Sequence, residues 1–242
     1  MLPTPSTSHV NYDHIYEPSE DSYLLLDTLS SATETNFLKS RFSPESTCPL
    51  ILEVGTGSGV VLAFAAANAQ HIFGRRDIAT LGSDVNLFAC TATSQTVKLA
   101  IAANKDVCGS MLDVISGDLT SPLRQALVDM VIFNPPYVPT ESLPSTGCPI
   151  STSDFERDSH LLSLSYAGGQ DGMETTNRLL DQLASILSRR GVAYILLCAQ
   201  NKPDEIVRQW QQTEGWTAAR VGESGKKAGW EKLCIVKIWR ER

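Results

Sequence analysis

Short apolar runs alternate with helical stretches along most of the chain. Five of these runs are expected to be strands, at residues 49–55, 78–85, 112–119, 127–133 and 191–198. Other stretches place apolar residues at helical spacing, at residues 60–69, 87–104, 172–190 and 203–212. Strands separated by helices require crossover connections, so the pattern predicts a parallel sheet. Runs such as "ILEV" and "YILL" lack polar alternation, which is typical of strands covered on both faces.

The two ends of the chain depart from this alternation. Residues 1–12 are rich in Pro, Ser and Thr and have little to bury, so we expect a disordered tail followed by one domain over residues 13–242. Ser19, followed by two acids, indicates a helix start. The last two apolar runs, "WTAARVG" and "EKLCIVKIW", predict an antiparallel hairpin. The expected fold class is therefore α/β, with a seven-stranded, mostly parallel sheet that ends in this hairpin.

One connection is too long to be a simple turn. Residues 138–166 are polar and rich in Pro and Ser. Loops of that length inside a compact domain are usually functional lids or flexible segments.

Composition narrows the class of protein. The chain has 242 residues, is 42% hydrophobic and carries a formal net charge of −7, which disfavours tight nucleic-acid binding without excluding it. The six cysteines are dispersed and no histidine flanks them at zinc-ligand spacing, so we expect reduced thiols and no metal. Without a leader pattern or an apolar run of about 18 residues, we expect no membrane association and a cytoplasmic protein, with the nucleus as a second compartment.

The first strand runs into a glycine-rich turn, "EVGTGSG", that begins at Glu53. Its glycines, Gly55, Gly57 and Gly59, do not match the spacing of a dinucleotide fingerprint. An acid just before the turn would repel a pyrophosphate but attract a cation. Asp84, at the end of the second strand, stands where a ribose-binding acid belongs. An ordinary tight turn and a solvated acid remain the alternatives.

A third acidic position completes a pattern that suits S-adenosylmethionine. Asp118, followed by Leu119, ends the third strand. Ligands bind beyond the carboxyl ends of the strands in such sheets. S-adenosylmethionine carries an ammonium and a sulfonium but no phosphate, so it matches acids better than a dinucleotide does.

The fourth strand stops in "NPPYV", Asn134 to Val138. A planar nitrogen is a poor nucleophile, because its lone pair is delocalised. Two acceptors aimed at its N–H bonds would hold it in line for attack: the Asn134 side-chain oxygen and the Pro135 carbonyl, here called the clamp. Pro135 and Pro136 fix the backbone, and Tyr137 offers a flat wall for stacking. The alternative is an ordinary strand that ends at prolines.

With the glycine turn and the acids, these residues resemble those of class I, Rossmann-like methyltransferases. The resemblance implies that Glu53, Gly55 and Gly57 hold the methionyl and ribose side of the cofactor, and that Asp84 binds the ribose hydroxyls. It also implies that Asp118 and Leu119 meet the adenine. Substrate contacts would come from Asn134 through Val138, with Asn134, Pro135 and Tyr137 catalytic and Asn134 also touching the cofactor.

Three further blocks make the resemblance more specific. "YEPSEDSYLLLDTL" (16–29), "YAGGQDGMETTNRLL" (166–180) and "GWEKLCIVKIW" (229–239) are similar to blocks of the eukaryotic HemK-type glutamine methyltransferases. The first block nominates Ser22 as a cofactor contact. Residues 139–165 are expanded relative to the family, which leaves the substrate contacts of this loop open.

The family resemblance implies a substrate and a partner. The substrate would be the glutamine of the Gly-Gly-Gln motif in the eukaryotic class-1 translation release factor, methylated on N5. The partner would be a small zinc-binding activator subunit. The third strand is expected at the sheet edge, so Met111 to Ile115 are predicted to pair with that subunit. An adenine-N6 methyltransferase, a lysine methyltransferase and a non-catalytic adaptor are the competing interpretations.

Overall fold

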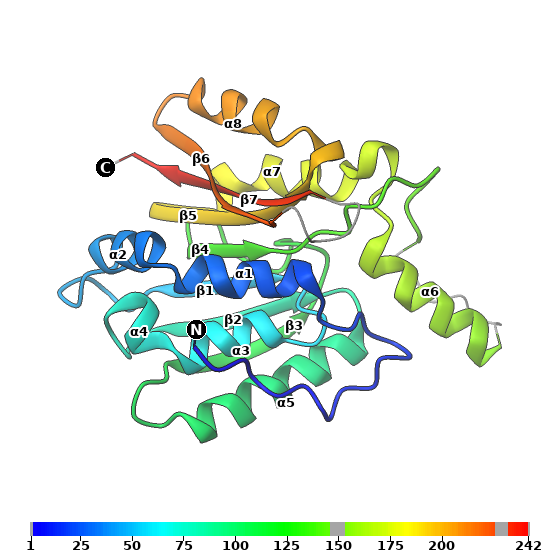
Figure 1. Ribbon diagram of the computed structural model, residues 1–242, viewed down its shortest axis with the longest axis horizontal. Helices are drawn as coiled ribbons and strands as arrows, with labels where there is room; N and C mark the ends of the chain where they lie inside the picture. Colours follow the sequence, from blue (N-terminus) through cyan, green and yellow to red (C-terminus); the bar gives the residue numbers. More distant parts are fainter. Residues whose placement is uncertain (1, 146–152, 226–231, 242) are drawn as a thin grey trace.

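The fold is a seven-stranded sheet between two layers of helices (Figure 1). The computed structural model describes residues 2–145, 153–225 and 232–241. The strands are β1 Leu50–Val54, β2 Ala79–Asp84, β3 Ser110–Ser116, β4 Val128–Phe133, β5 Leu187–Cys198, β6 Trp216–Glu223 and β7 Leu233–Arg240. Their order is β3-β2-β1-β4-β5-β7-β6. Strands β1 to β5 pair in parallel and β7 runs antiparallel to β5 and β6, which confirms the predicted fold class and the C-terminal hairpin.

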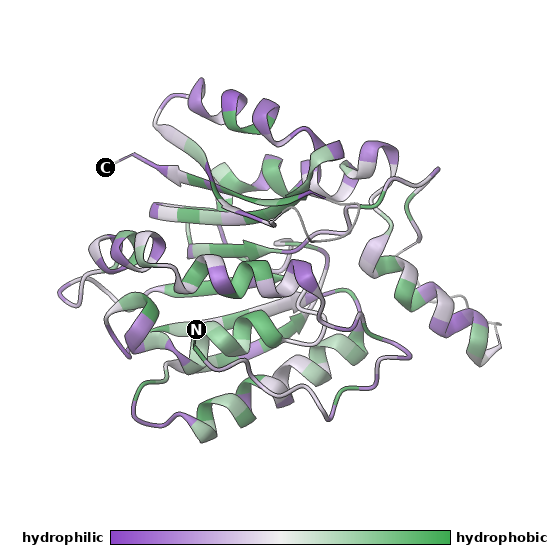
Figure 2. Ribbon diagram, viewed as in Figure 1, coloured by the Kyte–Doolittle hydropathy of each residue, from purple (hydrophilic) through white to green (hydrophobic). Residues whose placement is uncertain are grey.

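Apolar side chains of the central strands alternate between two cores. The helices are α1 Glu20–Ser30, α2 Ala32–Arg41, α3 Val60–Ala67, α4 Ala69–Phe73, α5 Leu87–Ala103, α6 Asp154–Tyr166, α7 Glu174–Ile186 and α8 Pro203–Gln211. Helices α1 to α4 pack on one core, and α7 and α8 pack on the other. The strands and α3 are the most hydrophobic parts of the chain (Figure 2). Burial on both faces explains why these strands lack polar alternation.

Three helices were not predicted: α2, α4, which begins where the predicted helix 60–69 ends, and α6. Helix α2 lies where the sequence shows no apolar periodicity, and it is held by a Ser31 cap on the Glu34 N–H. Helix α6 occupies the end of the predicted loop 138–166, and Ser153 and Glu156 form a capping box at its start. Ser153 and Glu156 have the spacing of a capping box in the sequence, whereas the polar composition of residues 138–166 predicts a loop. Part of that loop, residues 146–152, lies outside the described residues.

The N-terminal segment lies against α5. Val10 and Ile15 are buried in a small cluster with Ala89 and Ala92 of α5. The His9 ring is 3.1 Å from the Thr96 hydroxyl. The expected boundary between a tail at 1–12 and a domain at 13–242 stays a prediction, although residues of the tail pack on the domain.

Among the described residues, no helix is both long and apolar enough to cross a membrane.

Candidate functional site

The carboxyl ends of β1, β2 and β4 lie side by side. Val54 is in register with Ser83 on one side and with Phe133 on the other. The next residue of each strand is therefore at the same level: Gly55, Asp84 and Asn134. The strand order reverses at β1, and open α/β sheets bind ligands beyond the carboxyl ends of the strands at such a position.

A pocket opens at this end of the sheet, and most of the predicted site residues line it. Its lining includes Ser22, Glu53, Gly55, Gly57, Asp84, Asp118, Leu119, Asn134, Pro135 and Pro136. Tyr137 and Val138 are not in that lining. The Tyr137 ring instead packs partly buried against the core on the α1 side, so its role as a stacking wall stays a prediction.

The glycine turn keeps backbone close to the pocket. Gly55 and Gly57 have φ values of 64° and 52°, which favour glycine. A Cβ on Gly57 would meet nothing within 4 Å, whereas one on Gly59 would be 2.6 Å from Thr93 Cα of α5. Gly57 therefore leaves open space beside the turn, and Gly59 lets α3 pack against α5.

Two buried carboxyl groups lie at one end of the pocket. Glu53 Oε2 accepts the Leu62 N–H at 2.8 Å, and Asp84 accepts from Gly57 N–H at 3.0 Å and Asn86 N–H at 2.8 Å. Burial raises the pKa of Glu53 well above its usual value, and the Asp84 charge adds to this. Burial also raises the pKa of Asp84, against the opposing effect of its hydrogen bonds. Two acids held this way favour a cationic ligand.

The acid that follows the third strand is paired with a cation, unlike Glu53 and Asp84. Asp118 lies two residues beyond β3, and Arg178 of α7 pairs with its carboxylate. Leu119 is buried and has a φ of 52°, which is strained for a leucine, and its carbonyl accepts the Ser83 hydroxyl at 2.8 Å. Strain of this kind is retained mainly at functional positions. This hydrogen bond holds the segment that follows β3 against β2.

The clamp holds an unsatisfied acceptor. Asn134 Oδ1 is buried and has no hydrogen-bond partner within the described parts of the chain. An acceptor left in this state normally costs free energy of order 1–3 kcal/mol. The Asn134 amide oxygen is therefore available to a donor that enters the pocket.

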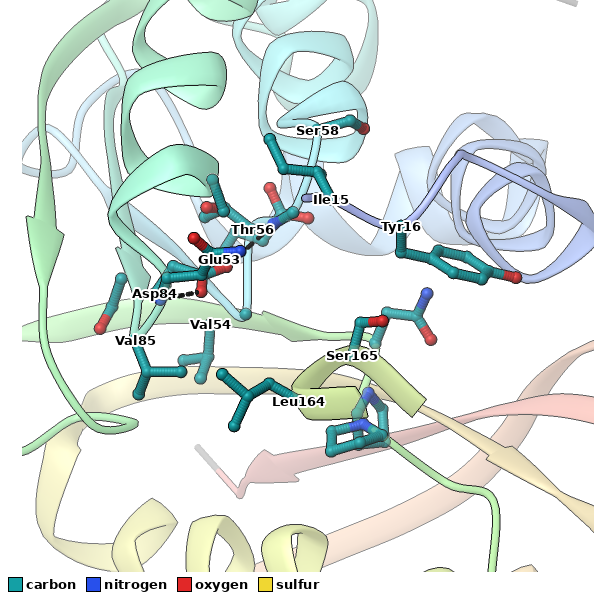
Figure 3. Close-up of a pocket in the computed structure, with 18 of the residues that line it drawn as sticks. Ile15, Tyr16, Glu53, Val54, Thr56, Ser58, Asp84, Val85, Leu164 and Ser165 are labelled. Carbon is teal, nitrogen blue, oxygen red and sulfur yellow. Dashed lines mark hydrogen bonds between the residues drawn. The ribbon is translucent and has the colours of Figure 1, made fainter. Parts of the chain in front are cut away.

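Part of the pocket wall is formed by residues that the sequence did not indicate. Leu161, Leu164 and Ser165 of α6 line the pocket, as does Tyr16. Figure 3 shows Asp84 at one end of the pocket, with Tyr16 and Ser165 toward the other. The α6 residues could not be placed because the helix itself was not predicted. Tyr16 precedes the helix start at Ser19, and its position depends on the packing of residues 10–15 against α5.

Comparison with known proteins decides the family. The chain is 36% identical over 246 residues to the eRF1 methyltransferase catalytic subunit mtq2 of Schizosaccharomyces pombe, covering 99% of this chain and 96% of that protein. It is 31% identical to methyltransferase HEMK2 of Homo sapiens, covering 97% of this chain and 95% of that protein. This chain belongs to the HemK-type release-factor glutamine methyltransferases. No family model matches it.

A solved structure supports the fold of this methyltransferase. The hMettl16 catalytic domain, solved in complex with the MAT2A 3'UTR hairpin 1, superposes with a TM-score of 0.53 at 12% identity. The match covers 96% of this chain and 73% of that one, and at this identity it bears on the fold alone. As a HemK-type enzyme, the chain is a protein-glutamine methyltransferase that uses S-adenosylmethionine.

The residues of the pocket fit that cofactor. Its ammonium and sulfonium charges suit the end where Glu53 and Asp84 are buried together. The open space beside Gly57 leaves room for a ligand against the backbone. Within the ranges that the structure describes, no group of three or more His, Cys, Asp or Glu is arranged to hold a metal ion.

Proposed function

We propose that this methyltransferase methylates N5 of the glutamine in the Gly-Gly-Gln motif of the eukaryotic class-1 translation release factor. The observation that carries the proposal is Asn134 Oδ1, a buried acceptor of a pocket-lining residue that has no hydrogen-bond partner among the described residues. A glutamine side chain can offer it an N–H, and a second N–H can reach the Pro135 carbonyl. The relatives named for eRF1 methylation support the choice of substrate. Their names do not favour the adenine-N6 or the lysine alternative.

The clamp works by position and by charge. With both N–H bonds of the substrate amide accepted, the nitrogen lone pair is directed toward the cofactor pocket. S-adenosylmethionine supplies a methyl group bonded to a cationic sulfur. Transfer breaks the carbon–sulfur bond, forms the carbon–nitrogen bond and leaves an extra proton on the nitrogen. That proton is acidic and passes to water, so the clamp needs no strong base.

We propose that each end of the cofactor contacts a different set of pocket residues. Glu53 and Asp84, with Gly55 and Gly57, face the cationic methionyl end and the ribose. Asp118 and Leu119 face the adenine, and Ser22 closes the pocket from α1. The Ser22 hydroxyl donates to Asp21 Oδ1 at 3.2 Å, so it is oriented from its own helix.

The test is transfer to a defined glutamine. We would incubate the chain, with and without the activator subunit, with S-adenosylmethionine and a release factor that contains Gly-Gly-Gln. Peptide mass spectrometry should find one added methyl on that glutamine. Asn134→Ala should lower kcat by about 100-fold or more, since it removes one of two positioning acceptors.

A control variant makes the same Asn-to-Ala change outside the pocket, at an exposed position. Asn11→Ala, in the N-terminal segment, should leave transfer unchanged. The proposal fails if the release factor gains no methyl from the wild-type protein while an adenine-containing oligonucleotide does.

We also propose that an activator subunit pairs with strand β3, through Met111 to Ile115. Strand β3 is at the sheet edge, and Leu112 is 60% exposed on it. Beside the strand, Val114 shares a shallow groove with Cys90 and Leu99 of α5, and Leu99 is half exposed. An apolar sheet edge of this kind favours strand addition.

Val114→Asp tests this edge. A buried charge at the junction should lower affinity for the subunit by about 100-fold, since removing or mispairing one central contact costs about 2–4 kcal/mol. Pull-down or calorimetry with the zinc-binding subunit measures the change. Ala219→Asp, on the opposite edge strand β6, is the control and should bind normally. Unchanged binding by Val114→Asp would refute the interface.

The last proposal concerns the compartment. A protein that modifies a translation release factor needs access to it, so we place this methyltransferase in the cytoplasm, with the nucleus as a second compartment.

A further inference from the structure

The backbone of residues 134–138, here called the clamp loop, is hydrogen-bonded to a glycine-rich segment at residues 166–172. Val138 N–H donates to the Tyr166 carbonyl at 2.9 Å, and Gly168 N–H donates to the Val138 carbonyl at 2.8 Å. A Cβ on Gly168 would be 2.6 Å from the Pro136 carbonyl oxygen, and one on Gly172 would collide with that of Tyr137. Because Gly168 and Gly172 have no side chains, residues 166–172 can lie directly against the clamp loop.

One side chain links this segment, the clamp loop and the end of β5. Asn201 is 3% exposed and lies at the end of η2, Ala199–Asn201, which follows β5. Its Nδ2 donates to the carbonyls of Asp171 at 3.1 Å, Tyr137 at 3.4 Å and Gly172 at 3.5 Å. Its Oδ1 accepts the Cys198 N–H at 2.8 Å.

The two ends of the Asn201 amide have different tasks. The oxygen caps η2, which any acceptor could do. The two N–H bonds of the nitrogen are shared among three backbone carbonyls, and one of these belongs to Tyr137, two residues after Pro135. The direction of the Pro135 carbonyl depends on where the following residues are held.

We propose that Asn201 is a positioning residue for glutamine methylation, acting through the Tyr137 carbonyl on the clamp. The inference rests on the proposed function, because it assumes that the clamp orients the substrate amide. Asn201 does not line the cofactor pocket, so its loss should lower kcat while S-adenosylmethionine affinity stays close to that of the wild type.

Asn201→Asp separates positioning from capping. The carboxylate keeps an acceptor for the Cys198 N–H, so a residue that only caps η2 would tolerate it. It cannot donate to the three carbonyls and repels them instead. The expected result is a fall in kcat of about 10- to 100-fold, the size that displacements near 1 Å produce. The dissociation constant for S-adenosylmethionine and the KM for the release factor should change less than about threefold.

All rates are expressed per cofactor-binding molecule, so that unfolded protein does not count. If Asn201→Asp does not bind cofactor, Asn201→Ala takes its place and must show the same loss of kcat. Asn68→Asp is the matched control: Asn68 is also buried and donates to a backbone carbonyl, that of Phe64, at the far end of α3. It should keep the wild-type kcat.

The outcomes distinguish the two proposals. Wild-type kcat in the cofactor-binding Asn201 variant, with transfer lost in Asn134→Ala, overturns the role of Asn201 and leaves the clamp intact. No methyl on the release-factor glutamine with the wild-type protein overturns both. A loss of kcat confined to Asn201, with Asn68→Asp unaffected, supports positioning.

Discussion

At the scale of single residues, burial of the Glu53 carboxyl disfavours its charge, whereas a cationic cofactor would favour it. The carboxyl is 2% exposed and close enough to Asp84 for the charge of that residue to raise its pKa further. In the absence of a cation, ionisation of such a group is costly. The same charge is what a cationic cofactor would bind, so the free energy that burial costs the empty protein is recovered on binding.

Glu53→Gln should therefore stabilise the cofactor-free protein and weaken cofactor binding. A carboxyl with a raised pKa binds an extra proton in the native state, so the free energy of unfolding falls as pH rises from its unfolded to its folded pKa. Glutamine does not titrate, so it does not cause this fall in unfolding free energy, and its oxygen can still accept the Leu62 N–H. Above that window we expect a gain in unfolding free energy and roughly tenfold or more weaker S-adenosylmethionine binding.

Urea unfolding at several pH values and calorimetry measure these two effects. Glu214→Gln, at an exposed position, should change neither. A Glu53→Gln protein that is less stable at high pH, or binds the cofactor as tightly as the wild type, would contradict this account.

At the scale of elements, the sheet could be predicted and parts of the pocket wall could not. Strands β1 and β4 are mostly apolar runs that the sequence shows directly. Glu53 lies near the end of β1 and Asn134 directly follows β4, so the sequence also places these two polar side chains at the strand ends. The register that brings Gly55, Asp84 and Asn134 to one level follows from parallel pairing. These features need only local patterns and general topology.

Helix α6 and Asn201 show the limit of that reasoning. Helix α6 is polar along most of its length, so its contribution of Leu164 and Ser165 to the pocket depends on where the whole helix is placed. Asn201 sits in "CAQNKP", which looks like a simple turn. Its role depends on Tyr137 and Asp171, residues 64 and 30 positions away. Long-range contacts of this kind leave no local signal.

At the scale of the whole molecule, a buried ion pair joins the first helices to the C-terminal hairpin. Lys237 of β7 donates to both oxygens of Glu34 at 3.0 and 2.9 Å, and the Tyr194 hydroxyl of β5 donates to the same carboxylate at 2.6 Å. Glu34 is fully buried, and the Lys237 ammonium lies 3.8 Å from the centroid of the Phe37 ring. Burial and the Glu34 charge raise the pKa of Tyr194, so it stays a neutral donor.

Lys237→Met should destabilise the fold without changing the chemistry. It keeps most of the apolar stem but leaves the Glu34 carboxylate buried without its lysine partner, which we expect to cost about 3–5 kcal/mol of unfolding free energy. The double variant Glu34→Gln/Lys237→Met should recover most of that loss, because the unpaired charge is gone. Urea unfolding of the single and double variants measures both. A double variant as unstable as Lys237→Met would mean that packing, rather than the stranded charge, sets the cost. The kcat of the folded fraction should remain that of the wild type, since Glu34, Lys237 and Tyr194 do not line the pocket.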